Sequence, residues 1–392
     1  MASLSVVNPD LFNSEKFKNA SCIVVKIGSA LLIDEKSNSL KEEWLRSLVS
    51  DVSDLKSEGK KIVIVSSGSI PMGKQILNLN VDSLSLEDSQ AAAAVGQIYL
   101  AQCYQKFLAD YNIIAAQILV TAEDSRDRRR YLNGRATLLK LLEMGVVPIV
   151  NENDTVATDE IRFGDNDRLA AQVSSLCDAD VLVLLSDVNG LYTGNPNVDK
   201  NASLIPIVEN INLQIEAMAN DYKTSLSKGG MKTKIEAARA AVSAGCHMVI
   251  TNGKVSNPLS KLRKGGLSTW FVSSGDPIKA RKQWIFNTKP NGKIYVDSGA
   301  EKALLKGKSL LPAGVLACDG LFKRGDTVSI LSSEGRPLAN GLVGYNNQEV
   351  DSISGCHSSK ISTILGHPGR AVLVHRNDMA INEYFRDKEL LQ

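Results

Sequence analysis

The chain has 392 residues, of which 43% are hydrophobic and 22% charged, and its formal net charge is +2. These values are ordinary for a globular protein, so they exclude a disordered chain, and the net charge is too small to dictate a nucleic-acid partner. No apolar run approaches the roughly 18 residues of a membrane span, and the N-terminus lacks the features of a signal peptide. The six cysteines are scattered without a CxxC pair, which argues against a zinc site or a disulfide framework. We therefore expect a soluble cytoplasmic protein of two or three domains that does not act at a membrane.

Residues 1–275 alternate between two patterns. Helical segments are expected at 42–59, 85–111, 134–145 and 232–245. Short β-branched runs precede and separate them, at 22–28, 60–68, 113–121, 145–154, 180–190 and 247–253. Continuous apolar strands between amphipathic helices are typical of parallel strands buried on both faces. The pattern predicts an α/β fold with an open, mostly parallel sheet sandwiched by helices.

Several of these strands run directly into small or polar residues. The polar ends lie at 26–29, 66–69, 151–154 and 186–187. In open α/β sheets, ligands bind beyond the carboxyl ends of the strands. Four such ends predict a site along one edge of the sheet.

The pattern of the sequence changes after residue 275. Residues 276–392 contain short segments with frequent glycine, and 16 lysines and arginines against 12 carboxylates. We expect a small β-rich domain there, with a boundary near Asp276, following the α/β domain of residues 1–275.

Residues 68–74 have the spacing GxxxxGK of a phosphate-binding P-loop. The next residue is Gln75, where a P-loop has the Ser or Thr that reaches magnesium, and Pro71 removes a backbone donor. We favour a glycine-rich turn from strand to helix that serves another ligand.

Two lysine-bearing stretches suit an anionic ligand. The sequence SKGGMKTK at 227–234 opens a helix, and its adjacent glycines and lysines would suit a nucleotide phosphate. The alternative for this stretch is a flexible loop with solvated lysines. Lys26 lies where the first strand ends, so it either faces a charged ligand or reaches past the strand end to solvent.

Residues 151–167, NENDTVATDEIRFGDND, hold six carboxylates against the single Arg162. This segment is either a solvated acidic loop or a loop that binds an amino group or a metal. Of the four histidines only His247 precedes the tail, and its place inside a strand suggests a structural role. A Ser-His hydrolase and a His-ligated metal enzyme are therefore disfavoured. Lysines and aspartates at strand ends remain, and they suit phosphoryl transfer.

Motifs along nearly the whole chain resemble the amino-acid kinase family, and within it the glutamate 5-kinases. They are VVKIGS (24–29), IVIVSSGSI (62–70), AAVGQ (93–97), DRRRYLNGRATL (127–138), PIVNENDTVA (148–157), FGDND (163–167), LLSDVNGLYTGNP (184–196) and GGMKTKIEAA (229–238). The tail resembles the PUA module, a fold otherwise known for binding RNA.

The resemblance implies that ATP and L-glutamate give ADP and L-glutamyl 5-phosphate, the first step of proline biosynthesis. The γ-carboxylate of glutamate has a pKa of about 4.3, so it is ionised at neutral pH and needs no general base. Mg²⁺ would be bound mainly by the phosphates of ATP, without a dedicated protein site. The resemblance also implies feedback inhibition by proline, a homo-oligomer (dimer or tetramer) and RNA as a possible partner of the PUA-like tail.

Roles are carried over motif by motif. Lys26, Asp167 and Lys234 would be catalytic, with Asp167 orienting both lysines at the transferring phosphoryl group. Ser67, Gly68, Asp154 and Asn166 would bind glutamate, with Asp154 facing its α-ammonium group. ATP would contact Lys26, Ser186, Asp187, Lys228, Gly229, Gly230, Met231, Lys232, Thr233 and Lys234. Between the two acidic motifs, Asp159, Glu160 and Arg162 are expected to be solvated or mobile.

Three departures from the family pattern bear on affinity and leave the reaction class intact. Lys228 and Ser186 each stand where the family usually has threonine, and Pro71 and Met72 lie near the glutamate site. Two alternatives stay open. One is another amino-acid kinase, acting on acetylglutamate, aspartate, carbamate or a nucleoside monophosphate. The other is an RNA-binding regulatory protein whose kinase fold has lost its activity.

Overall fold

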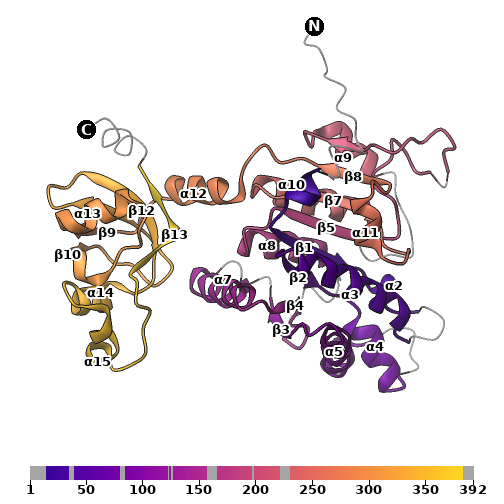
Figure 1. Ribbon diagram of the computed structural model, residues 1–392, viewed down its shortest axis with the longest axis horizontal. Coiled ribbons are helices and arrows are strands. Elements are labelled where there is room, and N and C mark those ends of the chain that lie inside the picture. Colours follow the sequence, from indigo (N-terminus) through magenta and orange to yellow (C-terminus); the bar gives the residue numbers. More distant parts are fainter. Residues whose placement is uncertain are drawn as a thin grey trace, which may run out of the picture. The chain divides into compact units, whose positions relative to one another are not determined.

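The computed structural model describes residues 15–34, 39–79, 84–121, 123–124, 127–156, 166–196, 198–220 and 230–382. The chain divides into two compact units, which we describe separately (Figure 1). The larger unit comprises residues 1–125 and 134–277, and the smaller unit comprises residues 126–133 and 278–392.

The larger unit is built on an eight-stranded sheet of order β3-β4-β2-β1-β5-β7-β8-β6. All six strands expected from the sequence form, and they pair in parallel. They are β1 (Cys22–Ile27), β2 (Lys61–Val65), β3 (Ala115–Val120), β4 (Val147–Glu152), β5 (Val181–Ser186) and β7 (His247–Asn252). Two further strands were not predicted: β8 (Ser268–Phe271) is antiparallel to β7, and β6 (Ile207–Val208) pairs with β8.

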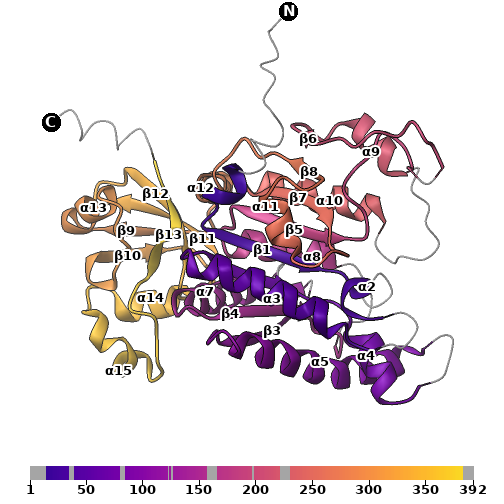
Figure 2. The ribbon, with the colours of Figure 1, turned by 45° about the vertical axis from the view of Figure 1, so that its right-hand side comes forward.

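Helices cover both faces of this sheet, because alternate strand residues point to opposite sides. Val25 and Ile64 pack under α3 (Glu42–Ser57), α5 (Leu86–Ala109) and α11 (Pro258–Arg263), on the face turned forward in Figure 2. Val24 and Val63 pack on the other face. The helices of that face are the later turns of α7 (Arg128–Glu143), α8 (Asn166–Leu176), α9 (Leu213–Asn220) and α10 (Met231–Ser243). Short helices α2 (Ser29–Leu32) and α4 (Ser69–Ile76) follow β1 and β2.

The helix ends follow the signals in the sequence. Ser85 caps α5 by accepting a hydrogen bond from the backbone N–H of Asp88 at 3.0 Å. Gly145 and Gly245 follow α7 and α10 with φ of +77° and +85°, the left-handed conformation that ends many helices. Within the described residues, none of the helices is both long enough and apolar enough to cross a membrane.

Helices α4 and α5 approach each other so closely that side chains do not fit between them. A Cβ atom on Gly73 would overlap the carbonyl group of Ala92, and one on Gly96 would overlap the carbonyl oxygen of Ser69. Gly73 therefore lies inside a helix and serves helix packing, so the GxxxxGK spacing is not a P-loop. Gly68, with φ of +99°, forms the turn between β2 and α4.

The smaller unit contains a five-stranded sheet of order β10-β9-β11-β12-β13, in which β9 and β11 are parallel and the other neighbours antiparallel. Ile294, Val328 and Val343 are fully buried in its core. The strands are β9 (Gly292–Val296), β10 (Val315–Asp319), β11 (Thr327–Ser332), β12 (Pro337–Val343) and β13 (Val374–Ile381). The accompanying helices are α12 (Pro277–Asn287), α13 (Ser298–Leu305), α14 (Asn347–Ile353) and α15 (Ile361–Leu365). The predicted β-rich domain is present, with more helix than the sequence pattern indicated.

The contact between α4 and α5 generates a prediction about stability. We expect Gly73→Ala to lower the free energy of unfolding by about 1–3 kcal/mol, because the new methyl group forces two backbones apart. Gly134→Ala is the matched control, since a Cβ atom there would meet nothing within 4 Å. That variant should be neutral or more stable by about 0.5–1 kcal/mol. Urea unfolding measures both, and equal stabilities of the two variants would contradict the close contact.

Candidate active site

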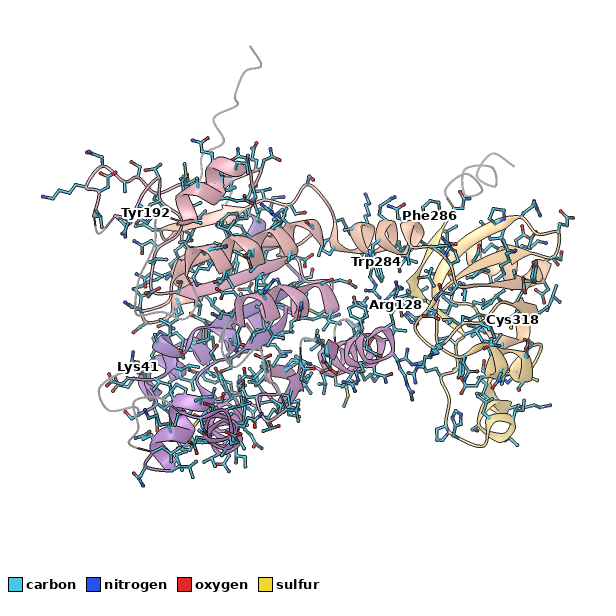
Figure 3. The ribbon with its side chains drawn as sticks, turned by 180° about the vertical axis from the view of Figure 1, so that it is seen from behind. Lys41, Arg128, Tyr192, Trp284, Phe286 and Cys318 are labelled. Atoms are coloured by element: carbon cyan, nitrogen blue, oxygen red, sulfur yellow. The ribbon has the colours of Figure 1, made fainter. Side chains whose placement is uncertain are left out.

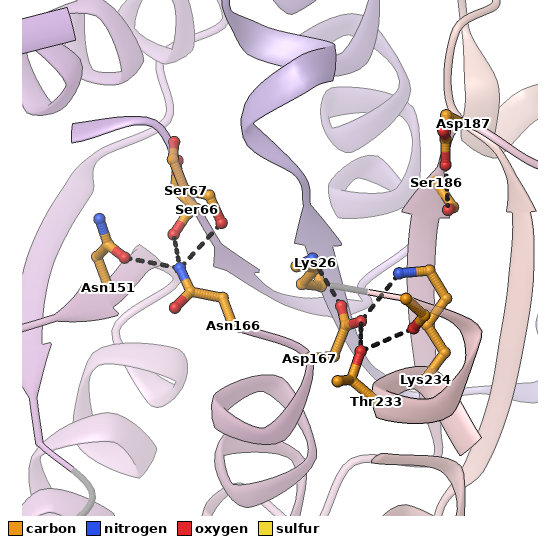
Figure 4. A network of polar contacts seen from close by, with 11 residues as sticks. Lys26, Ser66, Ser67, Asn151, Asn166, Asp167, Ser186, Asp187, Thr233 and Lys234 are labelled. Atoms are coloured by element: carbon orange, nitrogen blue, oxygen red, sulfur yellow. Dashed lines mark hydrogen bonds and ion pairs between the residues drawn. The ribbon is translucent and has the colours of Figure 1, made fainter. Parts of the chain in front are cut away.

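A buried carboxylate lies at the carboxyl edge of the larger unit's sheet. Asp167, the second residue of α8, is 1% exposed and contacts two ammonium groups (Figure 4). The Nζ atom of Lys26, near the end of β1, lies 2.6 Å from Oδ1. The Nζ atom of Lys234, in the first turn of α10, lies 3.0 Å from Oδ2. All three predicted catalytic residues therefore meet in one cluster, although they come from three separate elements.

The charge of this cluster is set by the balance of burial and attraction. Burial by itself raises the pKa of Asp167, but the ammonium groups of Lys26 and Lys234 outweigh it and hold the pKa well below its usual range. Asp167 is thus ionised at neutral pH, and two positive charges face one negative charge. The excess positive charge at a helix N-terminus suits an anionic ligand such as a phosphate group.

Thr233, one of the predicted ATP ligands, lies against the same carboxylate. Its hydroxyl oxygen is 3.4 Å from Oδ2 of Asp167, and the hydroxyl donates a shorter hydrogen bond of 2.8 Å to the carbonyl oxygen of Gly230. The bond to Gly230 ties the residue before α10 to its first turn. Lys234, one residue further, is thereby held in register with Asp167.

Asn166, the first residue of α8, connects the ends of β2 and β4 through hydrogen bonds. Its amide nitrogen donates to the carbonyl oxygen of Ser66 at 2.7 Å, to the hydroxyl of Ser67 at 2.9 Å and to Oδ1 of Asn151 at 2.9 Å (Figure 4). Ser66 and Ser67 follow β2, and Asn151 lies in β4. The predicted substrate ligands Ser67 and Asn166 are therefore in direct contact.

Asp154, beyond the end of β4, is a second buried carboxylate, 8% exposed. The hydroxyl of Ser69 donates to Oδ2 at 3.0 Å, and Gln97 also hydrogen-bonds to the carboxylate. Burial raises the pKa of Asp154 more than these two hydrogen bonds lower it, and no cation of the described residues contributes. A buried carboxylate whose charge is not offset by a cation is stabilised most by a ligand that carries a positive charge.

The remaining predicted ATP ligands that the structure describes belong to β5, α10 and the residues beside them, on the other side of β1. The hydroxyl of Ser186, at the end of β5, donates to Oδ1 of Asp187 at 3.2 Å. Met231 begins α10 and is buried, whereas Lys232 is exposed. Lys228 and Gly229 lie outside the described residues, as do Asp159, Glu160 and Arg162 of the acidic segment.

Several polar residues at the site had no role in the sequence-based prediction. Ser66 and Asn151 belong to the polar strand ends that the sequence pattern predicted. Their hydrogen bonds to Asn166 form only because the N-terminus of α8 lies at the ends of β2 and β4. Ser69 and Gln97 contact Asp154 from α4 and α5. A glutamine in the apolar run AAAAVGQI was the available signal, because a buried polar side chain needs partners.

His247 has the structural role that the sequence suggested. Its Nδ1 atom accepts a hydrogen bond of 3.0 Å from the backbone N–H of Ser273. Burial lowers its pKa to about 4, so the ring is neutral at physiological pH. The ring fixes the segment that follows β8 and takes no part in the site.

Comparison with known proteins gives two family matches and close relatives. The sequence model of the amino acid kinase family matches residues 21–252, and that of the PUA domain matches residues 292–365. Glutamate 5-kinase of Dinoroseobacter shibae is 56% identical over 362 residues, 92% of this chain and 98% of the relative. The enzyme of Paracoccus denitrificans is 56% identical over 366 residues, 93% and 98% of the two chains. That of Rhizobium johnstonii is 52% identical over 367 residues, 93% and 94%.

The environment of Asp154 predicts that this residue opposes folding at neutral pH. Its pKa in the folded chain lies above the ordinary value of 3.8, so its charge is unfavourable once the pH rises through the folded-state pKa. We expect Asp154→Asn to raise the free energy of unfolding at pH 7 by about 0.5–2 kcal/mol. The gain should vanish below pH 3.8, where the carboxyl group is protonated in both states. Chemical unfolding at several pH values measures it, with the exposed Asp187→Asn as control. A loss of stability at pH 7 would show that Asp154 is needed for folding.

Proposed function

The chain belongs to the amino acid kinase family, and we propose that it transfers the γ-phosphoryl group of ATP to the γ-carboxylate of L-glutamate. The products are ADP and L-glutamyl 5-phosphate, in the first step of proline biosynthesis, and the activity is that of a glutamate 5-kinase. The observation that carries the proposal is the contact of Asp167 with both Lys26 and Lys234 at the carboxyl edge of the sheet.

The reaction needs charge neutralisation more than proton transfer. An oxygen of the γ-carboxylate forms a bond to the γ-phosphorus, and the bond to the oxygen that bridges the β and γ phosphorus atoms breaks. No proton moves, because the carboxylate is ionised at neutral pH. An anion must approach a polyanion, so Lys26 and Lys234 reduce the repulsion and stabilise the oxygens of the transferring group. Asp167 fixes both ammonium groups before the substrates arrive.

Glutamate would bind on the side of β1 where β2 and β4 end. Asp154 is suited to the α-ammonium group, because an ion pair with that group would offset the cost of burying the charged carboxylate. Ser67 and Asn166 would bind carboxylate oxygens of the substrate, with Gly68 allowing close approach of the turn. Ser69 and Gln97 hold Asp154 in position.

ATP would bind on the side where β5 ends and α10 begins. Ser186 and Asp187 would contact the nucleotide, and residues 228–234 would contact its phosphates. A helix N-terminus favours phosphate binding through its free backbone N–H groups and its dipole. The described residues contain no group of three or more His, Cys, Asp or Glu side chains placed to hold a metal ion. The family resemblance implies that Mg²⁺ is bound through phosphate oxygens and water, where it would supply further charge neutralisation.

Other features of the proposal concern location, partners and regulation. We assign residues 1–275 to the kinase domain and 276–392 to a PUA-like domain with RNA as its possible partner. Proline carries an α-amino group and an α-carboxylate like glutamate, so it would compete at Asp154 as a feedback inhibitor. The six unpaired cysteines suit the reducing cytoplasm. A dimer or tetramer is the proposed assembly.

The direct test is to incubate the purified protein with ATP, Mg²⁺, hydroxylamine and L-glutamate and to measure glutamyl hydroxamate. We expect hydroxamate with glutamate, because an acyl phosphate reacts with hydroxylamine. Aspartate and acetylglutamate serve as acceptor controls and should give little product. Product with acetylglutamate in preference to glutamate would assign a different amino-acid kinase activity.

Asp167→Asn tests the role of the central carboxylate. The neutral side chain cannot hold two ammonium groups, so we expect kcat to fall by roughly 100- to 1,000-fold. Apparent affinity for ATP should change far less, since the lysines keep their charge. Steady-state hydroxamate kinetics measure both quantities, and the exposed Asp199→Asn is the control. A normal kcat in Asp167→Asn would remove this residue from the mechanism.

A further inference from the structure

The smaller unit contains three arginines that lie near one another, outside the site described above. Arg129 belongs to the first turn of α7, Arg324 to the turn between β10 and β11, and Arg370 to the segment before β13; we call them the arginine cluster. The charges of Arg370 and Arg129 both act on Arg324: burial first, and then these charges, lower the pKa of Arg324. Three like charges brought together oppose folding unless an anion offsets them.

The neighbouring carboxylate is already engaged. Glu349 is the carboxylate whose charge acts on Arg324. Its Oε2 atom accepts a hydrogen bond of 2.9 Å from the backbone N–H of Asn346, in the capping box of α14. Its Oε1 atom lies 3.5 Å from Nε2 of His367. One carboxylate with both oxygens in use leaves the cluster with an excess of positive charge.

The guanidinium of Arg324 is held in place but is not fully hydrogen-bonded. One of its terminal nitrogens donates to Oδ1 of Asn133 at 2.6 Å. Its Nε atom is buried, and it has no hydrogen-bond partner within the described part of the chain. Buried donors are nearly always paired with protein, water or an ion, so an unpaired Nε in a positive environment points to an anionic ligand.

The backbone around Arg324 and Arg129 is fixed by close packing. Gly325, with φ of +97°, lies so near the backbone of Arg128 that a Cβ atom would come within 2.9 Å of its carbonyl carbon. Arg128 itself has structural contacts: it donates to the hydroxyl of Thr327 at 3.1 Å and lies over the ring of Trp284 at 5.3 Å (Figure 3). The turn of Arg324 and the first turn of α7 thus form a preformed surface.

The third arginine is held equally well. The hydroxyl of Tyr345, which is buried, donates to the carbonyl oxygen of Arg370. Gly369 packs on the same ring, where a Cβ atom would lie 2.6 Å from the hydroxyl oxygen. The position of Arg370 beside Arg324 therefore results from packing and not from a flexible chain end.

We propose that the arginine cluster binds a phosphate group. Guanidinium groups bind phosphate through paired, charge-assisted hydrogen bonds, and the unpaired Nε of Arg324 offers one such donor. The ligand is either a small phosphorylated molecule or the backbone of a single-stranded nucleic acid. The cluster belongs to the smaller unit and the catalytic lysines to the larger unit, so loss of the cluster is expected to leave phosphoryl transfer to glutamate intact.

The test uses the full chain and compares wild type with Arg129→Gln, Arg324→Gln and Arg370→Gln. Arg336→Gln is the matched control, because this exposed arginine of the same unit pairs with Glu301 and Glu334 and lies outside the cluster. The thermal midpoint is measured against inorganic phosphate, with KCl keeping the ionic strength constant. Phosphate should stabilise wild type and the control at concentrations about 10-fold lower than it stabilises each cluster variant. Arg129→Gln alters an exposed side chain, so it reports on binding even if Arg324→Gln folds poorly.

A second measurement identifies the source of the phosphate group. Fluorescence anisotropy with a short single-stranded RNA, at several salt concentrations, is run on the same five proteins. Weaker RNA binding by the cluster variants than by the control assigns the site to a nucleic-acid backbone. Phosphate binding without RNA binding assigns it to a small phosphorylated ligand. Equal phosphate and RNA responses in all five proteins overturn the proposal, and hydroxamate formation should be unchanged in every variant.

Discussion

A carboxylate that is 1% exposed stays ionised in this protein because two ammonium groups touch it. A buried charge without a partner is so costly that the group would take up a proton instead. Removing both lysines would leave Asp167 as an uncompensated buried charge, which typically costs roughly 3–5 kcal/mol, whereas the loss of one lysine leaves it paired with the other. Lys26, Asp167 and Lys234 come from β1, α8 and α10, so these three elements must stay in register for both ammonium groups to contact the carboxylate. The rest of the larger unit is arranged around that requirement.

The sheet topology explains how the three groups come together. β1 lies between β2 and β5, and Lys26 is aligned with Val65 on one side and Leu184 on the other. The chain leaves β4 and returns to the sheet at β5, and α8, between them, packs on β1, β2, β4 and β5. Its N-terminus therefore lies at the carboxyl ends of the central strands. The proposed glutamate ligands follow β2 and β4 or begin α8, and the proposed ATP ligands lie at the end of β5 and at the start of α10. The phosphoryl group would pass between them over β1.

Much of this architecture could be predicted from local patterns. The six parallel strands are apolar runs that end in polar residues, and that pattern depends only on burial on both faces. β8 and β6 escaped prediction because STWF is short and partly polar, and its antiparallel pairing with β7 arises from tertiary contacts. Helix α7 begins at Arg128, six residues before its predicted start, because its first turns contain three arginines and little apolar periodicity.

The sequence predicted the place of the site, but not the hydrogen bonds that support it. Strand ends and lysines indicated where an anion would bind, and the resemblance to a family supplied the roles of Lys26, Asp167 and Lys234. The bonds from Ser69 and Gln97 to Asp154 could not be inferred, because they require α4 and α5 to lie against each other. The arginine cluster could not be inferred either, because its members are far apart in the sequence. Arg129 lies almost 200 residues before Arg324, and Arg370 lies nearly 50 residues after it.

The backbone contact at Gly96 has an evolutionary consequence. Gly96 precedes Gln97, and the backbone that it touches is that of Ser69, so one contact sets the spacing of both groups that bond to Asp154. A substitution that enlarges residue 96 would displace both groups that bond to Asp154 at once and would open the packing of two helices. Descendants of this sequence are therefore expected to keep residue 96 small for as long as Asp154 keeps these two hydrogen-bond partners.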